Sequence, residues 1–318
     1  MNQTNDTKNS QPRPPVVVVM GHVDHGKTTL LDYIRKSNVA GKEAGGITQS
    51  VGAYEIVHNN RKITFIDTPG HEAFTKMRSR GASIADLAIL VVAAEEGLKP
   101  QTKEVIKILN DTKTPFVVAI NKVDKPEANI EKVKQELTTE GVLLEGYGGH
   151  VSFEPISAKT GQNVNELLDL ILLATDYENL TYDSSAPATG FILEAKVDPR
   201  RGMEVTAIVK NGTLKQGDDI VTLSAKGKVK ILENFLGEKA KELLPSSPAL
   251  IIGFETLPQV GEEFTAGKNV STDSVNKITA PLNRGITQAN AQDENAIKFL
   301  IKASDSGSLE ALLAIMKS

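Results

Sequence analysis

The sequence contains no cysteine, which excludes a disulfide framework and a zinc–thiolate site. It also lacks an apolar run of about 18 residues, the length that a membrane-spanning helix requires. The first fifteen residues are polar, contain three prolines and lack the apolar core of a secretory signal. We therefore expect a flexible tail over residues 1–14 and a cytoplasmic protein without membrane contact.

Neither sign of charge dominates, because 36 Lys and Arg face 40 Asp and Glu and the formal net charge is −4. Bulk charge therefore gives no attraction to nucleic acid, and any RNA contact must come from a local patch. Hydrophobic residues make up 40% of the chain and charged residues 24%, which argues against wholesale disorder. The 318 residues suffice for two or three folded units.

Short apolar runs alternate with helix-like stretches as far as residue 180. The predicted buried strands are residues 16–20, 63–67, 87–93, 115–120 and 151–156. The predicted helices are residues 27–36, 101–110, 130–141 and 163–177. This alternation is typical of a mostly parallel sheet with helices on both faces, so we expect an α/β domain over residues 15–180.

The period then changes from helical to two-residue. Residues 181–268 contain short strands, and Asn211-Gly212 is a hairpin-type turn between two of them, which predicts a small antiparallel β-barrel. In residues 269–318 we expect a polar linker, a strand at 296–303 and a helix at 308–316. One strand and one helix cannot close a core, so this segment predicts the start of an incomplete third domain.

Residues 21–30 read GHVDHGKTTL and contain the spacing G-x-x-x-x-G-K-[ST] between a strand and a helix. The loop backbone would wrap phosphates, Lys27 would contact their β and γ oxygens, and the Thr28 hydroxyl would complete a Mg²⁺ shell. The residues that we expect to bind the nucleotide phosphates are Asp24, His25, Gly26, Lys27, Thr28 and Thr29.

Residues 121–124 read NKVD and follow the fourth predicted strand. The Asp124 carboxylate can accept hydrogen bonds from guanine N1–H and N2, whereas adenine would leave it unpaired. Asn121 would bridge neighbouring loops, and the stem of Lys122 would lie over the ring. The motif therefore predicts guanine recognition.

The tripeptide Ser157-Ala158-Lys159 follows the fifth strand and belongs to the same predicted site. The Ala158 N–H can donate to guanine O6. Alone the tripeptide has little specificity, but its order and its place at a strand end support the guanine site.

Residues 67–70 read DTPG and close the second predicted strand. Asp67 can reach Mg²⁺ through a water, the Gly70 N–H can bind the γ-phosphate, and Thr48 can supply a second hydroxyl to the metal. Two contacts that depend on the γ-phosphate, on two flexible segments, predict a switch that is ordered with GTP and released after hydrolysis. His71 stands beside Gly70, where it could orient the attacking water; a surface or capping histidine fits its position equally well.

Other polar residues have simpler interpretations. His22, Asp24 and His25 could suggest a metal site, but the backbone of their loop already serves phosphate. Arg78 and Arg80 are expected on a solvated helix face or, less simply, on a partner-binding surface. The basic residues of the barrel region are expected to keep its surface hydrated: Arg200, Arg201, Lys226, Lys228 and Lys230.

Together these segments resemble the translational GTPases, and among them the family of bacterial translation initiation factor two. The segments that carry this resemblance are GHVDHGKTTL (21–30), GGITQ (45–49), GAY (52–54), DTPGHEAFTKMRSRGA (67–82), residues 91–102 and NKVDKP (121–126). The resemblance extends over residues 15–266, includes NGTLKQGD (211–218), and continues in LIKASDSGSLEAL (300–312), which is similar to the start of the family's third domain.

The resemblance implies a ribosome-stimulated GTPase that promotes ribosomal subunit joining with initiator tRNA and uses Mg²⁺. It implies that His71 is the catalytic residue that positions water, that Val23 and Ile47 form a hydrophobic gate beside it, and that Asp24 takes part in holding a monovalent cation. The family's tRNA-binding barrel is missing from the sequence, so we expect contact with the ribosomal subunits and ribosomal RNA, no binding of initiator tRNA by this chain, and a monomer.

Two alternatives stay open on the sequence. One is another translational GTPase, such as an elongation factor. The other is a non-hydrolysing module that docks to the ribosome and uses its nucleotide pocket for structure. No arginine finger is evident in the sequence, which predicts slow unassisted turnover, about 10⁻⁴–10⁻² s⁻¹.

Overall fold

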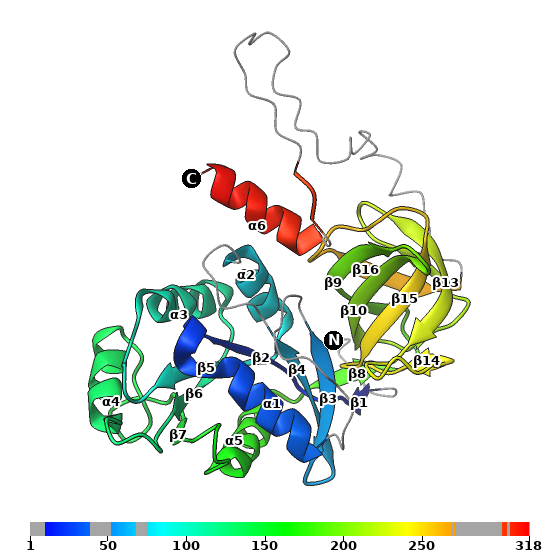
Figure 1. Ribbon diagram of the computed structural model, residues 1–318. Coiled ribbons are helices and arrows are strands. Elements are labelled where there is room, and N and C mark those ends of the chain that lie inside the picture. The colour runs from blue at the N-terminus through cyan, green and yellow to red at the C-terminus, as the bar shows by residue number, and fades with distance from the viewer. Residues whose placement is uncertain are drawn as a thin grey trace, which may run out of the picture.

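The computed structural model describes residues 10–38, 52–67, 75–268, 270, 301–303 and 306–317. Over these residues the chain forms a six-stranded sheet flanked by helices, a closed β-barrel beside it, and a C-terminal helix (Figure 1).

The sheet has the expected mixed, mostly parallel order. Its strands, from one edge to the other, are β3 (Ala53–His58), β4 (Arg61–Asp67), β2 (Val16–Gly21), β5 (Leu87–Ala93), β6 (Phe116–Asn121) and β7 (Phe153–Pro155). Only β3 runs antiparallel, paired with β4 through a turn at Asn59 and Asn60. The parallel strands β4, β2, β5, β6 and β7 therefore end at one edge of the sheet, and the loops that follow them meet there.

Helices cover both faces of this sheet. Helices α1 (Lys27–Asn38) and α5 (Val164–Asp176) pack on one face, and α2 (Thr75–Ile84), α3 (Pro100–Thr112) and α4 (Ile130–Thr139) pack on the other (Figure 1). Side chains of β2 alternate between these layers, so Val17 and Val19 contact the α1 side and Val16 and Val18 the other. All four are fully buried, and each burial stabilises the fold by about 1.5–3 kcal/mol.

The barrel closes with six strands. In neighbour order they are β10 (Gly202–Asn211), β15 (Pro248–Phe254), β13 (Lys226–Glu233), β12 (Asp219–Val221), β16 (Glu263–Gly267) and β9 (Ala188–Asp198). Short strands β11 (Leu214–Lys215) and β14 (Glu242–Leu243) pair beside it. The expected turn at Asn211-Gly212 lies between β10 and β11, and Gly212 has a φ of 68°, which a side chain would strain.

The N-terminal segment differs from the predicted tail. Ser10–Pro12 forms strand β1, which pairs antiparallel with β8 (Thr181–Asp183). Tyr182 is buried and its hydroxyl donates to Gln11 at 2.9 Å. The sequence gives no sign of this pairing, because β1 is exposed and polar and its partner is 171 residues away along the chain. Residues 1–9 lie outside the described part of the chain.

A buried ion cluster joins the sheet to the barrel. Asp86, just before β5, receives both guanidinium nitrogens of Arg13 at 2.6 and 2.7 Å and the Lys210 ammonium of β10 at 2.7 Å. The Val16 N–H donates to the same carboxylate at 2.8 Å. Burial alone raises the pKa of Asp86, but the hydrogen bond from Arg13 and the charges of Lys210 and Arg13 outweigh it and lower this pKa.

Neutral hydrogen bonds extend the same junction. The Thr64 hydroxyl of β4 donates to the Ser246 carbonyl at 2.7 Å, and the Ser246 hydroxyl donates to the Pro14 carbonyl at 2.6 Å. Ser247 donates to Glu55 of β3 at 2.8 Å. These bonds fix the barrel against the sheet edge opposite to the loops that follow β2 and β5.

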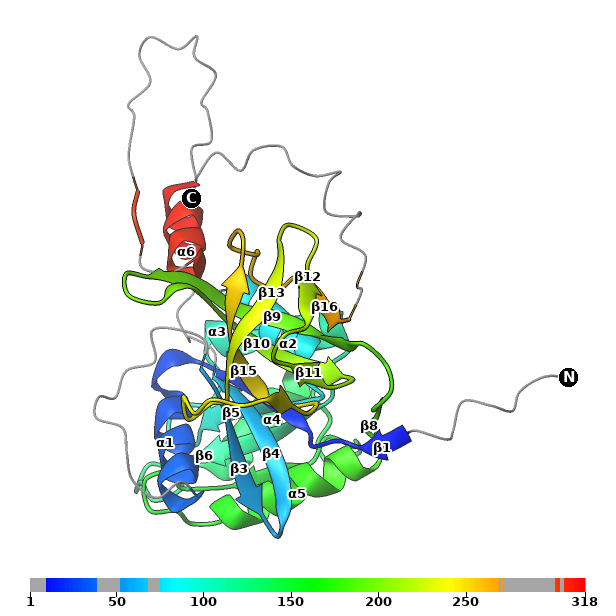
Figure 2. The same ribbon diagram turned by 90° about the vertical axis from the view of Figure 1, so that its right-hand side faces the viewer.

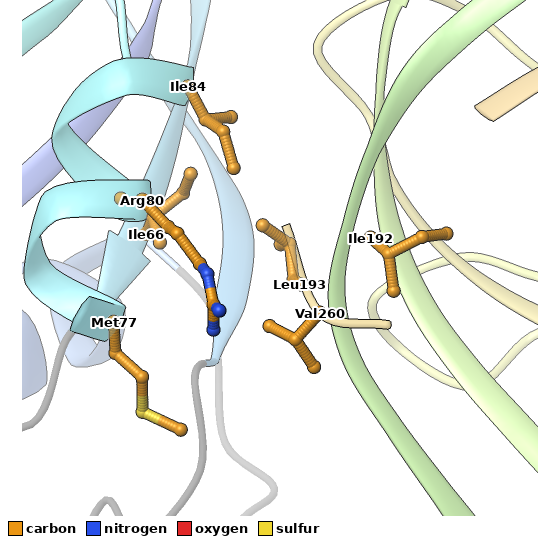
Figure 3. Close-up of a pocket in the computed structure, with 8 residues that line it drawn as sticks. Ile66, Met77, Arg80, Ile84, Ile192, Leu193 and Val260 are labelled. Carbon is orange, nitrogen blue, oxygen red and sulfur yellow. The ribbon is translucent and has the colours of Figure 1, made fainter. Parts of the chain in front are cut away.

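An apolar cleft separates α2 from the barrel. Its walls are Ile66, Met77, Arg80, Gly81 and Ile84 on one side and Ile192, Leu193 and Val260 on the other (Figure 3). The Arg80 side chain points from α2 into this cleft and is half-buried, so it does not lie on the fully solvated helix face that the sequence predicts (Figure 3).

Helix α6 (Ser306–Lys317) follows the barrel in the chain and contacts β9 (Figures 1 and 2). It confirms the helix predicted at residues 308–316. The strand predicted at residues 296–303 is wrong for residues 301–303, which have no strand partner, and residues 296–300 lie outside the described part. Among the helices that the structure describes, none is long and apolar enough to cross a membrane.

Candidate nucleotide-binding site

The loop after β2 lies at the centre of the sheet's carboxyl edge. Gly21 has a φ of 144°, and a Cβ there would collide with the Val91 carbonyl of the neighbouring strand. Gly26 also has a positive φ, 89°, and ends the 3-10 turn η1 (Val23–His25) just before α1 begins at Lys27. The two glycines let the backbone curl tightly between strand and helix.

Lys27 fills the concave side of this loop. Its ammonium donates to the carbonyls of Gly21 at 2.8 Å and His22 at 2.6 Å, and the residue is only 5% exposed. Burial lowers the pKa of Lys27 to about 8; the Asp67 carboxylate opposes this shift and the Arg78 cation adds to it. A cation therefore faces the N-terminus of α1, where helix geometry favours an anion.

Of the three residues expected to bind a metal through oxygen, the structure describes Thr28 and Asp67 but not Thr48. Thr28 and Thr29 are exposed in the first turn of α1, and Asp67 ends β4 with 3% exposure and acts electrostatically on Lys27. Thr48, Gly70 and His71, together with Ile47 of the expected gate, lie outside the described residues.

Asn121 links three loops at this edge. Its side-chain amide donates to the His25 carbonyl of the phosphate loop at 2.9 Å, and its oxygen accepts from the Ala158 N–H at 2.9 Å. Asn121 is 2% exposed and ends β6, so the strand fixes its position. The phosphate loop and the Ser157-Ala158-Lys159 loop are thereby held to the same side chain.

Asp124 is exposed, but its carboxylate is held in place. The hydroxyl of buried Ser157 donates to Asp124 at 2.6 Å and accepts from the Thr160 N–H at 3.2 Å. The hydrogen bond from Ser157 is the main cause of a lowered pKa for Asp124, which is therefore ionised near neutral pH. Lys159 is exposed beside it.

The two histidines of the phosphate loop serve its structure. His25 is fully buried, its Nδ1 lies 3.3 Å from the Val91 carbonyl, and burial lowers its pKa to about 4. His22 Nδ1 lies 2.5 Å from the side-chain oxygen of Gln101, which also accepts from the Val23 N–H at 3.3 Å. Within the described ranges no group of three His, Asp or Glu side chains could hold a metal ion.

Arg78 corrects a prediction. The sequence places it on a solvated helix face, but the residue is 1% exposed and donates to Glu104 of α3 at 2.8 Å and to Thr75 at 3.0 Å. Spacing alone missed this because the burial of Arg78 depends on Glu104, which belongs to a different helix.

Two further residues at this edge escaped the sequence reasoning. Gln101 accepts from the phosphate loop, and Glu95, in the loop after β5, binds Lys122. Both stand in residues 91–102, a segment that carries the family resemblance, and this is the signal that could have found them.

Comparison with known proteins decides the family. Residues 13–176 match the family model of the elongation factor Tu GTP binding domain, which is more than half of the chain. The chain belongs to the translational GTPases. Residues 187–267 of this translational GTPase match a second model, elongation factor G domain 2.

This translational GTPase is a homologue of translation initiation factor IF-2. It is 44% identical to the factor of Alkaliphilus metalliredigens over 96% of this chain, and 44% identical to that of Bacillus subtilis over 96%. It is also 44% identical, over 97% of its length, to a chloroplastic factor of Rhodomonas salina. The chain covers 46%, 45% and 43% of these three relatives, so it spans less than half of their length.

Solved structures agree with this placement. The GDP-bound aIF5B of Aeropyrum pernix has a TM-score of 0.64 and 32% identity, covering 84% of this chain and 56% of that one. The elongation factor SelB of Methanococcus maripaludis, in complex with the GTP analogue GppNHp, has a TM-score of 0.63 and 28% identity, covering 82% of this chain and 56% of that one. The translational GTPase therefore shares its sheet and barrel with proteins solved with guanine nucleotides.

Proposed function

We propose that this chain is the GTP-binding and GTP-hydrolysing part of a translation initiation factor. The observation that carries the proposal is the double hydrogen bond of Asn121, which joins the loop around Lys27 to the loop around Ala158. A single buried side chain thus fixes the distance between a cationic phosphate loop and an acidic base reader.

The phosphates bind at the N-terminus of α1. Lys27 already donates to two loop carbonyls, and it exchanges one or both for phosphate oxygens when a nucleotide enters. The loop glycines leave the backbone N–H groups accessible to the same oxygens. Gly70 supplies a further N–H to the γ-phosphate.

Guanine binds between the loops that follow β6 and β7. Ser157 aims the ionised Asp124 carboxylate, which accepts from guanine N1–H and N2. The Ala158 N–H, which donates to the Asn121 side-chain oxygen in the nucleotide-free site, turns or shares this hydrogen bond to donate to guanine O6. Adenine offers no donors at these positions, so it leaves the carboxylate unpaired.

The residues present fit a Mg²⁺ ion. Exposed Thr28 and buried Asp67 offer a hydroxyl and a carboxylate beside Lys27, and hard oxygen ligands of this kind suit magnesium. Thr48 completes this proposed set. When bound, the ion would neutralise charge on the β- and γ-phosphates.

Hydrolysis depends on His71, which orients the attacking water, and on a ribosomal stimulus. The ribosomal subunits and ribosomal RNA are the proposed partners, and initiator tRNA binds elsewhere in the full-length factor. Without a stimulus we expect turnover near 10⁻⁴–10⁻² s⁻¹, about the range of unassisted switch GTPases. The proposed compartment is the cytoplasm; one relative is chloroplastic.

Titration calorimetry on the 318-residue chain, freed of nucleotide, tests the binding step. GTP and GDP should release heat with one site per chain, and ATP should release none. Heat from ATP alone would overturn the proposal.

Ribosome-stimulated phosphate release tests the chemical step. His71→Ala should retain GTP binding and lose the stimulated release, and the unsubstituted chain supplies the reference. An unchanged rate of stimulated phosphate release in the variant would show that His71 does not orient the attacking water.

A further inference from the structure

The loops after β5 and β6 leave the sheet side by side. Ala93 and Asn121 are register partners in the two parallel strands, and the Ala94 N–H donates to the Asn121 carbonyl at 2.7 Å. The next side chains along the two loops, Glu95 and Lys122, therefore come from adjacent positions at the nucleotide edge.

Glu95 holds two lysines of the NKVDKP segment at once. Lys122 donates to one carboxylate oxygen at 2.7 Å, and the Lys125 ammonium lies 2.5 Å from the other. The Glu95 side chain is 14% exposed, that of Lys122 is 21% exposed and that of Lys125 is 46% exposed. Both oxygens of one carboxylate are thus committed to the loop that reads the base.

The backbone adds a second constraint on Lys122. Its φ is 66°, a left-handed conformation that few residues with a side chain adopt. The left-handed turn fixes one end of the lysine side chain, and the ammonium at the other end is held by Glu95 at 2.7 Å, with Glu96 more distant at 3.6 Å. The methylene stem runs between these two fixed points, and Lys122 lies in the chain between the buried Asn121 and the exposed Asp124.

We propose that Glu95 is a positioning residue for nucleotide binding, which fixes the Lys122 ammonium so that the lysine stem forms a preformed apolar cover over the guanine ring. This inference rests on the proposed function, because it needs a guanine nucleotide in the site. A free lysine loses about 2 kcal/mol of rotamer entropy when it is immobilised. Glu95 removes much of that loss from the binding step, since the stem is ordered before the nucleotide arrives.

This role differs from that of Asp124. A cover over the ring face contacts any purine in the site, whereas Asp124 reads the hydrogen-bonding edge. Loss of Glu95 should therefore weaken the binding of guanine and hypoxanthine nucleotides by the same factor, and the ratio of their two affinities should stay unchanged.

The test compares Glu95→Gln with Glu140→Gln in the full chain. Glu140 forms a similar carboxylate–ammonium pair with Lys103, 2.5 Å long and 29% and 54% exposed, away from the base loops. The measured quantities are the dissociation constants of GDP and IDP and the dissociation rate of GDP. We expect Glu95→Gln to weaken both nucleotides by about three- to tenfold, the range that a half-buried ion pair supplies, mainly through faster dissociation.

A spectroscopic readout separates positioning from general support of the loop. The Lys122 methylene protons should shift upfield when GDP binds the unsubstituted chain, because they lie over an aromatic ring. In Glu95→Gln this shift should shrink while the chain keeps the thermal unfolding midpoint of Glu140→Gln in the absence of nucleotide.

Three results would overturn the inference: GDP affinity in Glu95→Gln equal to that in Glu140→Gln, a changed GDP-to-IDP ratio, or an undiminished upfield shift. Failure of the proposed function gives a different pattern, since the unsubstituted chain would then bind neither GDP nor IDP.

Discussion

The cluster around Asp86 should be the most sensitive point of the junction between sheet and barrel. Asp86→Asn removes the charge that two cations share, while the side chain keeps its shape. Arg13 is 10% exposed and Lys210 is 18% exposed, so neither recovers full hydration. Breaking a buried pair costs about 3–5 kcal/mol, and the residual exposure of the two cations favours the lower end, about 3 kcal/mol.

Urea unfolding measures this loss. With a slope of about 3 kcal/mol per molar urea, the midpoint should fall by about 1 M. Asp176→Asn is the matched control, because Asp176 also receives both guanidinium nitrogens of an arginine, Arg61, at 3.0 and 2.5 Å. This pair is 45% and 53% exposed, so its loss should cost less than about 1 kcal/mol. Equal midpoints for the two variants would refute the reasoning.

The lowered pKa of Asp86 also predicts how the difference in unfolding free energy between the unsubstituted chain and Asp86→Asn depends on pH. A carboxyl group whose pKa falls on folding stabilises the fold above its ordinary pKa of 3.8. The gap between the unsubstituted chain and Asp86→Asn should therefore be constant near neutral pH. This stability difference should shrink as the pH falls below 3.8 and through the lower pKa that Asp86 has in the folded chain. A stability difference that grows on acidification would contradict a lowered pKa for Asp86.

Two further predictions concern the nucleotide site. The pKa of Lys27 is about 8 without nucleotide, and bound phosphate should raise it. GDP affinity should therefore be constant below about pH 8 and should fall above it by up to about tenfold per pH unit. A GDP affinity that stays constant up to about pH 9.5 would contradict this prediction. Asp124→Asn should weaken GDP by at least about tenfold and shift preference toward xanthine nucleotides, whose C2 oxygen replaces the amino donor; competition binding of GDP and XDP measures it, and an unchanged GDP affinity would count against Asp124 as the base reader.

The buried parallel strands could be predicted because short, continuous runs of β-branched and aliphatic residues bounded by turns are typical of such strands. The strands expected at residues 16–20, 63–67, 87–93 and 115–120 correspond to β2, β4, β5 and β6 within a few residues. Strand β3 was missed, since it is an edge strand with Glu55 and His58 among its apolar residues and only two of its six side chains fully buried.

The site was predictable to the extent that motif residues follow strand ends. Asn121, Asp124, Ser157 and Lys27 carry their chemistry in the sequence, and parallel topology brings the strand ends together. Contacts between side chains far apart in the chain were not predictable. Glu95 meets Lys122 only because two strands are in register, and the burial of Arg78 depends on Glu104 in a different helix.

Helix α2 lies between the phosphate loop and the barrel, and its side chains interact with both. Arg78 lies near enough to Lys27 to depress that lysine's pKa, while Met77, Arg80 and Ile84 form one wall of the cleft whose other wall is the barrel. Because one helix borders both surfaces, a displacement of α2 would change its distance from Lys27 and the width of the cleft beside Leu193 and Val260 together.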